Sequence, residues 1–245
     1  KQFILPTPVK VVAQANNIEV FQPNDINTQS SQLKAHSCDF LVVVAYGQIL
    51  SKELLAMPRV APINVHASLL PRWRGAAPIQ NAILAGDRQT GVTVQRMVEE
   101  LDEGPVLAQA TLSLDEHETL STLHDRLADL GAALLLNTLK QPLTETPQKG
   151  DIVICHKLKR ADGDVDPGEA TAAEIDTVVR ALVPWPGVRC QIHGHTVKLI
   201  ETSLTETPDS TPLSCKGDTV LHVVKLQPPG KKPMSGQDWQ RGIKS

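Results

Sequence analysis

The sequence predicts an α/β protein in which a sheet-containing domain is followed by a small β domain. Residues 40–45 are apolar and rich in β-branched side chains, as expected of a strand covered on both faces in a parallel sheet. The last part of the chain instead contains short strand-like pieces separated by turns rich in Gly, Pro and Asp, which is typical of a small barrel or sandwich. Aromatic residues make up only 3% of the chain, so the core must consist mainly of Ala, Val, Leu and Ile.

The elements of the first domain follow from hydrophobic spacing and from turn residues. Helices are expected at residues 8–17, 30–37, 78–84 and 119–139, and strands at residues 18–21, 40–45 and around 63–66. In the helix at 119–139, leucines recur at spacings of three and four, which predicts that they lie in the core. Residues 141–150 are rich in Thr, Pro and Gln without periodicity, which indicates the start of a linker.

The second domain is predicted to begin with a helix. Thr171 and Glu174 fit a capping box, and an apolar stripe follows until Pro184 stops the helix. Strands are then expected at residues 188–192, 196–200 and 219–226. We therefore predict a first domain at 1–147, a linker at 148–166 and a second domain at 167–245.

Polar residues within the first domain indicate a site for acyl transfer. Asn64 and His66 are two residues apart, so on a strand they leave the same face while Ile63 and Val65 point into apolar packing. An amide that donates and an imidazole that can be charged suit an oxygen that gains negative charge during reaction. Asp102, on a later turn, supplies a carboxylate that can orient the imidazole and favour its charged form.

Two stretches resemble a known family. The run NVHASLLPRWRGAAPIQ at residues 64–80 resembles, without a gap, the formyltransferases that use a formylated tetrahydrofolate as donor. The run QPPGKKPMSG at residues 227–236 is similar to the C-terminal part of the same family. The resemblance implies a Rossmann-like formyltransferase domain with a mostly parallel sheet, followed by a β-barrel of the oligonucleotide-binding type. It also implies an N-terminal strand-helix unit before the segment that starts near Lys1, and we expect this unit to be missing from the given sequence.

The resemblance further implies the reaction. It points to transfer of the formyl group of 10-formyltetrahydrofolate to the α-amino group of methionine on initiator methionyl-tRNA, in translation initiation. Asn64, His66 and Asp102 would be the catalytic residues. The folate co-substrate is expected to contact two segments, which comprise Tyr46, Gly47, Gln48, Ile49, Ser68, Leu69, Leu70 and Pro71. A monomeric protein is expected.

Charge distribution suggests where a tRNA would bind. A net charge of -3 gives no global basic signal, but residues 216–245 hold more Lys and Arg than Asp. Lys231 and Lys232, which follow a Pro-Pro-Gly turn, are expected to contact phosphates. Arg72 and Arg74 lie beside the catalytic segment and have two open interpretations. They either bind phosphates of the acceptor end or pair with carboxylates at the surface.

Two alternative functions stay open. An enzyme of the same fold that formylates an amino sugar or small amine, or that hydrolyses the folate, would use Asn64, His66 and Asp102 equally well. The segment at residues 228–232 argues against it, because a small-molecule enzyme has little need for such a basic turn. The alternative from another class is a non-catalytic RNA-binding module, against which the intact catalytic residues argue.

Cysteine usage and hydropathy indicate the compartment. Cys38, Cys155, Cys190 and Cys215 are isolated and lack metal-ligand spacing, which predicts no metal site and a reducing environment. No Gly-rich dinucleotide fingerprint is present, which argues against a dinucleotide cofactor. No apolar run approaches the roughly 20 residues needed to span a bilayer. We therefore expect a cytoplasmic protein without membrane contact.

Overall fold

A computed structural model describes residues 5–29, 33 and 37–243 of the chain. The chain forms two compact units. The first comprises residues 1–41 and 46–62, and the second comprises residues 42–45 and 63–245. Among the described residues, no helix is long and apolar enough to cross a membrane.

The first unit contains short helices: α1 (Pro8–Ala15), η1 (Ile26–Gln29) and α3 (Lys52–Leu55). Helix α1 begins where Thr7 caps it, because the Thr7 Oγ1 accepts a hydrogen bond from the Lys10 amide at 3.4 Å. The prediction of a helix here is confirmed, whereas the strand expected at 18–21 is wrong. That segment is irregular and leaves Ile18 exposed, since a β-branched run forms a strand only where backbone partners and a covering face are present. The helix expected at 30–37 lies mostly outside the described residues.

A four-stranded sheet forms the centre of the α/β part, in the order β1-β2-β4-β5. Its strands are β1 (Phe40–Val44), β2 (Ala61–His66), β4 (Gln89–Arg96) and β5 (Val106–Ser113). The pairs β2·β4 and β4·β5 are antiparallel, so the parallel pairing expected of this sheet is not found in these two pairs. Strand β1 was expected to be covered on both faces, but it is the end strand of the sheet and leaves Val42 and Val44 exposed.

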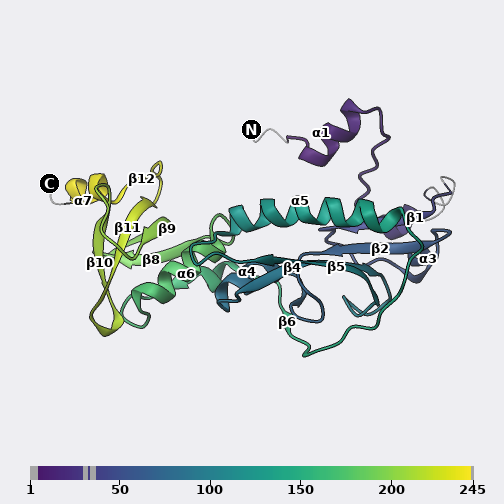
Figure 1. Ribbon diagram of the computed structural model, residues 1–245. Coiled ribbons are helices and arrows are strands. Elements are labelled where there is room, and N and C mark those ends of the chain that lie inside the picture. The colour runs from purple at the N-terminus through teal and green to yellow at the C-terminus, as the bar shows by residue number, and fades with distance from the viewer. Residues whose placement is uncertain (1–4, 30–32, 34–36, 244–245) are drawn as a thin grey trace. The chain divides into compact units, whose positions relative to one another are not determined.

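Helices α4 (Pro78–Leu84) and α5 (Leu120–Leu139) confirm the predicted helices of this region. Figure 1 shows α5 running along the sheet, where it packs on β4 and β5. Thr119 caps α5, and three of the predicted core leucines, Leu120, Leu123 and Leu127, are buried. The remaining two, Leu130 and Leu134, are partly buried against the same core. The periodicity of the sequence therefore predicted the face that α5 presents to the sheet.

The C-terminal part is a small β domain. Its elements are η2 (Arg160–Gly163), β7 (Asp164–Val165), α6 (Ala172–Leu182), β8 (Val188–Ile192), β9 (His195–Ser203), β10 (Thr211–Cys215), η3 (Lys216–Asp218), β11 (Thr219–Gln227), β12 (Met234–Ser235) and α7 (Gly236–Ile243). The strands follow the order β10-β11-β9-β8-β7, with β12 beside β11. Their pairings are antiparallel except for β7·β8. The expected small β domain is confirmed, and closure of its sheet into a barrel stays a prediction.

Helix α6 joins the β domain to the rest of the second unit. Thr171 and Glu174 form the predicted capping box, and Ile175, Val179 and Leu182 are buried. The core that these residues enter also contains Leu123 of α5. Residues 63–245 pack as one compact unit, and the predicted boundaries of 1–147, 148–166 and 167–245 remain a proposal.

Candidate active site

Strand β2 presents Asn64 and His66 toward one carboxylate. The Asn64 Nδ2 donates to the Asp102 Oδ1 at 3.3 Å, and the His66 Nδ1 lies 3.6 Å from the same oxygen. Ile63, on the opposite face of the strand, is fully buried. The alternation of a strand thus brings the predicted amide, imidazole and carboxylate together, as the spacing of Asn64 and His66 indicated.

The carboxylate of Asp102 is almost fully buried and accepts hydrogen bonds at both oxygens. Its Oδ1 also accepts from the Gln95 Nε2 at 2.9 Å, and its Oδ2 accepts from the Gly75 amide at 2.9 Å. The backbone of Asp102 has a φ of 55°, a left-handed conformation that side-chain-bearing residues rarely adopt. A charged group in this setting is held in one position and acts only as an acceptor.

The two ring nitrogens of His66 have different partners. The Nε2 lies 2.9 Å from the Trp73 carbonyl oxygen, and because a carbonyl can only accept, the Nε2 carries a proton. The Nδ1 lies 3.6 Å from the Asp102 Oδ1, beyond hydrogen-bond distance but close enough for electrostatic attraction if the ring is charged. A proton on the Nδ1 in addition to the one on the Nε2 would make the ring positively charged. Because the Nε2 proton is engaged, His66 can donate it to a substrate oxygen only if its bond to Trp73 is exchanged.

Side chains of β4 and β5 hold the backbone of the turn that follows β2. This turn contains the predicted folate residues Ser68, Leu69, Leu70 and Pro71. Thr93 of β4 donates its Oγ1 to the Ser68 carbonyl at 2.6 Å and accepts from the Leu70 amide at 3.1 Å. The Gln109 Nε2 donates to the Leu70 carbonyl at 2.9 Å. These backbone groups are therefore engaged within the protein, so a pterin would have to use the other backbone groups of the turn.

The other predicted folate residues, Tyr46, Gly47, Gln48 and Ile49, belong to the first unit. The Gln48 side chain accepts from the Ile26 amide at 2.9 Å and donates to the Asn24 carbonyl at 3.0 Å. Tyr46 and Ile49 are exposed. Gln48 thus holds the loop while its neighbours remain available for a ligand, and folate contact by this segment stays a prediction.

Arg72 is paired with a carboxylate in the structure. It binds Asp87 through two hydrogen bonds, at 2.9 and 2.6 Å, and lies 4.4 Å above the Trp73 ring. The hydrogen bond to Asp87 raises the pKa of the Arg72 guanidinium. The Arg72 side chain is 44% exposed, so it could contact a phosphate while it stays paired with Asp87 or after that ion pair breaks.

Arg74 is buried rather than presented to solvent. Its Nη1 lies 3.1 Å from the Glu103 Oε1, and its Nε and Nη2 donate to the Gln148 Oε1 at 3.1 and 2.9 Å. The interpretation as a carboxylate-paired arginine fits this geometry, and the phosphate contact of Arg74 stays a prediction. The sequence could not distinguish the two, because burial of Arg74 depends on residues distant in the chain.

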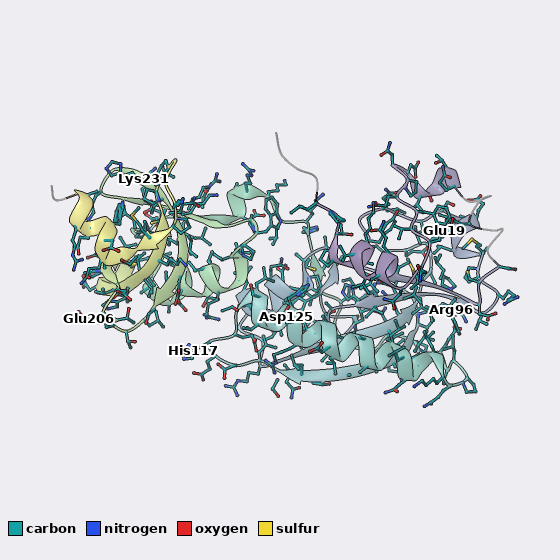
Figure 2. All side chains as sticks on the ribbon, turned by 90° about the horizontal axis from the view of Figure 1, so that it is seen from above. Glu19, Arg96, His117, Asp125, Glu206 and Lys231 are labelled. Carbon is teal, nitrogen blue, oxygen red and sulfur yellow. The ribbon has the colours of Figure 1, made fainter. Side chains whose placement is uncertain are left out.

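Lys231 and Lys232 are exposed on a turn, as predicted. The turn is closed by a hydrogen bond from the Lys231 amide to the Pro228 carbonyl at 3.2 Å, with Gly230 at a φ of 70°. Figure 2 labels Lys231 on the small β domain. Both ammonium groups are thus displayed where they could follow a phosphate backbone.

Two glutamines at the site were missed from the sequence. Gln95 lies directly across the strand pair from Asn64, and its Oε1 is buried without a hydrogen-bond partner. Gln148 contacts the Asp102 loop from the predicted linker. The alternation of polar Thr93 and Gln95 with apolar Val92 and Val94 on β4 was an available signal, whereas Gln148 carried none. Within the described residues, no group of three or more His, Cys, Asp or Glu could hold a metal ion.

Comparisons with known proteins agree with this architecture. Residues 3–139 match the family model described as formyl transferase, and residues 157–244 match the model of the formyl transferase C-terminal domain. A methionyl-tRNA formyltransferase from Magnetococcus marinus is 44% identical over 96% of this chain and 81% of its own length. The matches confirm the expected Rossmann-like formyltransferase domain and its C-terminal companion.

Solved structures with low sequence identity show the same fold. HypX from Aquifex aeolicus in complex with tetrahydrofolic acid has a TM-score of 0.71 at 17% identity over 91% of this chain. The chain spans only 41% of the length of that protein. A methionyl-tRNA formyltransferase from Clostridium thermocellum has a TM-score of 0.64 at 15% identity, with 89% of this chain and 91% of the other covered.

Proposed function

The chain belongs to the formyl transferase family, and from this premise we propose that it formylates the methionine carried by initiator tRNA. The donor in this proposal is 10-formyltetrahydrofolate, and the acceptor is the α-amino group of methionyl-tRNA. One observation carries the proposal: Asn64, His66 and the buried Asp102 meet at one point of the formyltransferase domain. The name of the relative that is 44% identical supports the acceptor, and the tetrahydrofolic acid bound to HypX supports the donor class.

The chemistry is a direct transfer between two nitrogens. The uncharged amine attacks the formyl carbon, and the carbon–oxygen double bond becomes a single bond to a negatively charged oxygen. The bond between that carbon and the folate nitrogen then breaks while the carbonyl re-forms. The amine loses one proton and the folate nitrogen gains one, so no covalent enzyme intermediate is required.

Asn64 and His66 would stabilise the charged oxygen. An amide nitrogen has two N–H groups, and Asn64 commits one of them to Asp102, which leaves the second for the substrate. His66 would contribute its Nε2 proton after the formyl oxygen replaces the Trp73 carbonyl as acceptor. Asp102 keeps the ring charged and oriented throughout.

Formyl transfer to several acceptors tests the proposal. The full chain should formylate methionyl initiator tRNA in the presence of 10-formyltetrahydrofolate, and it should leave free methionine and amino sugars almost unmodified. A preference for an amino sugar would instead support the small-molecule alternative. Release of formate without an acceptor would support hydrolysis of the folate. Binding of tRNA without any transfer would support the non-catalytic RNA-binding alternative.

The β domain would bind the tRNA. Lys231 and Lys232 lie on an exposed turn of this domain and could neutralise phosphates without reading bases. Arg72, which is partly exposed beside the catalytic residues, could do the same at the acceptor end. We propose that the protein acts as a monomer, with the folate and the charged tRNA as its two partners.

A further inference from the structure

We propose that Gln148 is a positioning residue, which sets the place of Asp102 against His66 from a segment outside the catalytic strands. The inference rests on the proposed function for its kinetic consequence, and on geometry alone for its structural part. Gln148 lies in a stretch whose composition indicated only the start of a linker. In the structure, Gln148 instead forms a hydrogen bond directly with the loop that carries the catalytic carboxylate.

The Gln148 side chain makes two hydrogen bonds to this loop. Its Nε2 donates to the Asp102 carbonyl at 2.8 Å and to the Gly104 carbonyl at 2.8 Å. A primary amide has two N–H groups, so both are used on carbonyls that lie two residues apart. The Gln148 amide therefore links the backbone carbonyls on either side of Glu103 and holds the loop in one conformation.

Arg74 fixes the orientation of the Gln148 amide. The Gln148 Oε1 accepts two hydrogen bonds from the Arg74 guanidinium, which also pairs with Glu103 at 3.1 Å. Reversing the amide would place its N–H groups against a cation and its oxygen against two carbonyls. Arg74 is 8% exposed, so these charge-assisted bonds are shielded from water.

A second attachment reaches the other side of the Asp102 side chain. Residues Ile154–Cys155 form strand β6, which pairs in parallel with β3 (Arg74–Gly75). The amide of Gly75 donates to the Asp102 Oδ2, and a Cβ at Gly75 would lie 2.3 Å from the Cys155 carbonyl oxygen. Glycine is therefore required for the approach of β6. The chain between 148 and 155 holds the Asp102 backbone directly through Gln148 and supports its carboxylate indirectly, through the pairing of β6 with Gly75.

The loop needs such support because its backbone is strained. Asp102 has a φ of 55°, and a residue in this region persists only where its surroundings determine it. Gly104 lies so close to β4 that a Cβ would meet the Arg96 carbonyl oxygen. Loss of the Gln148 bonds would let the carboxylate move relative to the Nδ1 of His66, from which it is 3.6 Å away. Catalytic contacts of this kind tolerate little displacement.

The variants Gln148→Ala and Gln148→Glu test the proposal in the full chain. Gln148→Glu keeps an acceptor for Arg74 but loses both donors, so it removes the contacts with the Asp102 loop while retaining the one with Arg74. We expect each variant to lower kcat by roughly tenfold to a hundredfold, as for supporting residues elsewhere, with KM for both substrates within about threefold. Gln141→Ala, an exposed glutamine of the same stretch, is the matched control and should match the parent.

Two further measurements separate positioning from loss of stability. Val197→Ala opens a cavity in the core of the β domain, on strand β9, and it should lower the melting temperature without the same loss of kcat. The ring ¹⁵N signals of His66, identified by their loss in His66→Gln, should shift in Gln148→Ala toward those of Asp102→Asn. A structural role alone would not move these signals.

The proposal holds if kcat and the His66 signals both change in the Gln148 variants. It is overturned if either matches the parent, or if Val197→Ala lowers kcat as much at equal stability. It is also overturned if Asp102→Asn leaves the His66 signals unchanged. A parent chain that transfers no formyl group would refute the proposed function instead, and the ¹⁵N comparison would then decide the positioning role by itself.

Discussion

Replacing Asp102 by asparagine should nearly abolish turnover while leaving the fold in place. The change preserves shape but removes a charge and turns one acceptor oxygen into a donor. If the new NH₂ group takes the place of Oδ1, it faces the N–H groups of Asn64 and Gln95, which then have no acceptor. If it takes the place of Oδ2, it faces the backbone N–H of Gly75, which then has no acceptor. In either orientation, at least one buried donor loses its partner.

The magnitude follows from the distance between the carboxylate and the imidazole. Two unit charges separated by 3.6 Å at an effective dielectric constant of about 20 attract by about 5 kcal/mol. Because about 1.4 kcal/mol corresponds to a factor of ten in rate, complete loss of this attraction limits the effect to three or four orders of magnitude. Since part of it is recovered by relaxation and water, we expect a loss of roughly a thousandfold in kcat.

Single-turnover formylation of methionyl initiator tRNA at saturating folate measures this effect. Circular dichroism and a melting curve should show a folded variant. A folded variant with turnover within a few fold of the parent would exclude Asp102 from the mechanism.

Three further predictions concern other parts of the molecule. Asn64→Ala should lower kcat by roughly a hundredfold with folate affinity nearly unchanged in a binding titration, since it removes a donor to the charged oxygen; near-normal turnover would disprove this role. Replacing Lys231 and Lys232 together by Ala should raise KM for charged tRNA and flatten the salt slope by about one unit per lost contact, whereas an unchanged slope would place tRNA binding elsewhere. The hydrogen bond from the Thr171 backbone lowers the pKa of Glu174 from its ordinary value of 4.5, so its stabilisation is present above that pH and lost as pH falls through the folded-state pKa. The melting temperatures of the parent and Glu174→Gln should therefore differ near neutrality and converge in acid, and a constant difference would contradict the cap.

Local features of the fold could be predicted because they depend on nearby residues. Thr171 and Glu174 are three positions apart, and the capping box that they form needs nothing from the rest of the chain. The shared face of Asn64 and His66 follows from the geometry of any strand. These two predictions rest on short sequence separations, and both agree with the structure.

Long-range features could not be predicted in this way. Gln148 lies 46 positions from Asp102 and binds its backbone carbonyl, a partner that no side-chain pattern marks. Arg74 is buried only because Glu103 and Gln148 meet it there. Strand β1 contains the apolar residues of a covered strand, but exposure depends on its position at the end of the sheet order. In each case the missing information is which residues, distant in the chain, lie next to one another in the folded protein.

The attachment of residues 148–155 to the Asp102 loop limits how freely the two domains can be separated or exchanged. A fragment ending at residue 147 would contain Asn64, His66 and Asp102 but would lack both Gln148 and strand β6. A chimera that joins this catalytic domain to a foreign C-terminal domain must therefore retain the connecting segment as part of the enzyme. The functional module therefore extends beyond the point at which composition alone would end it.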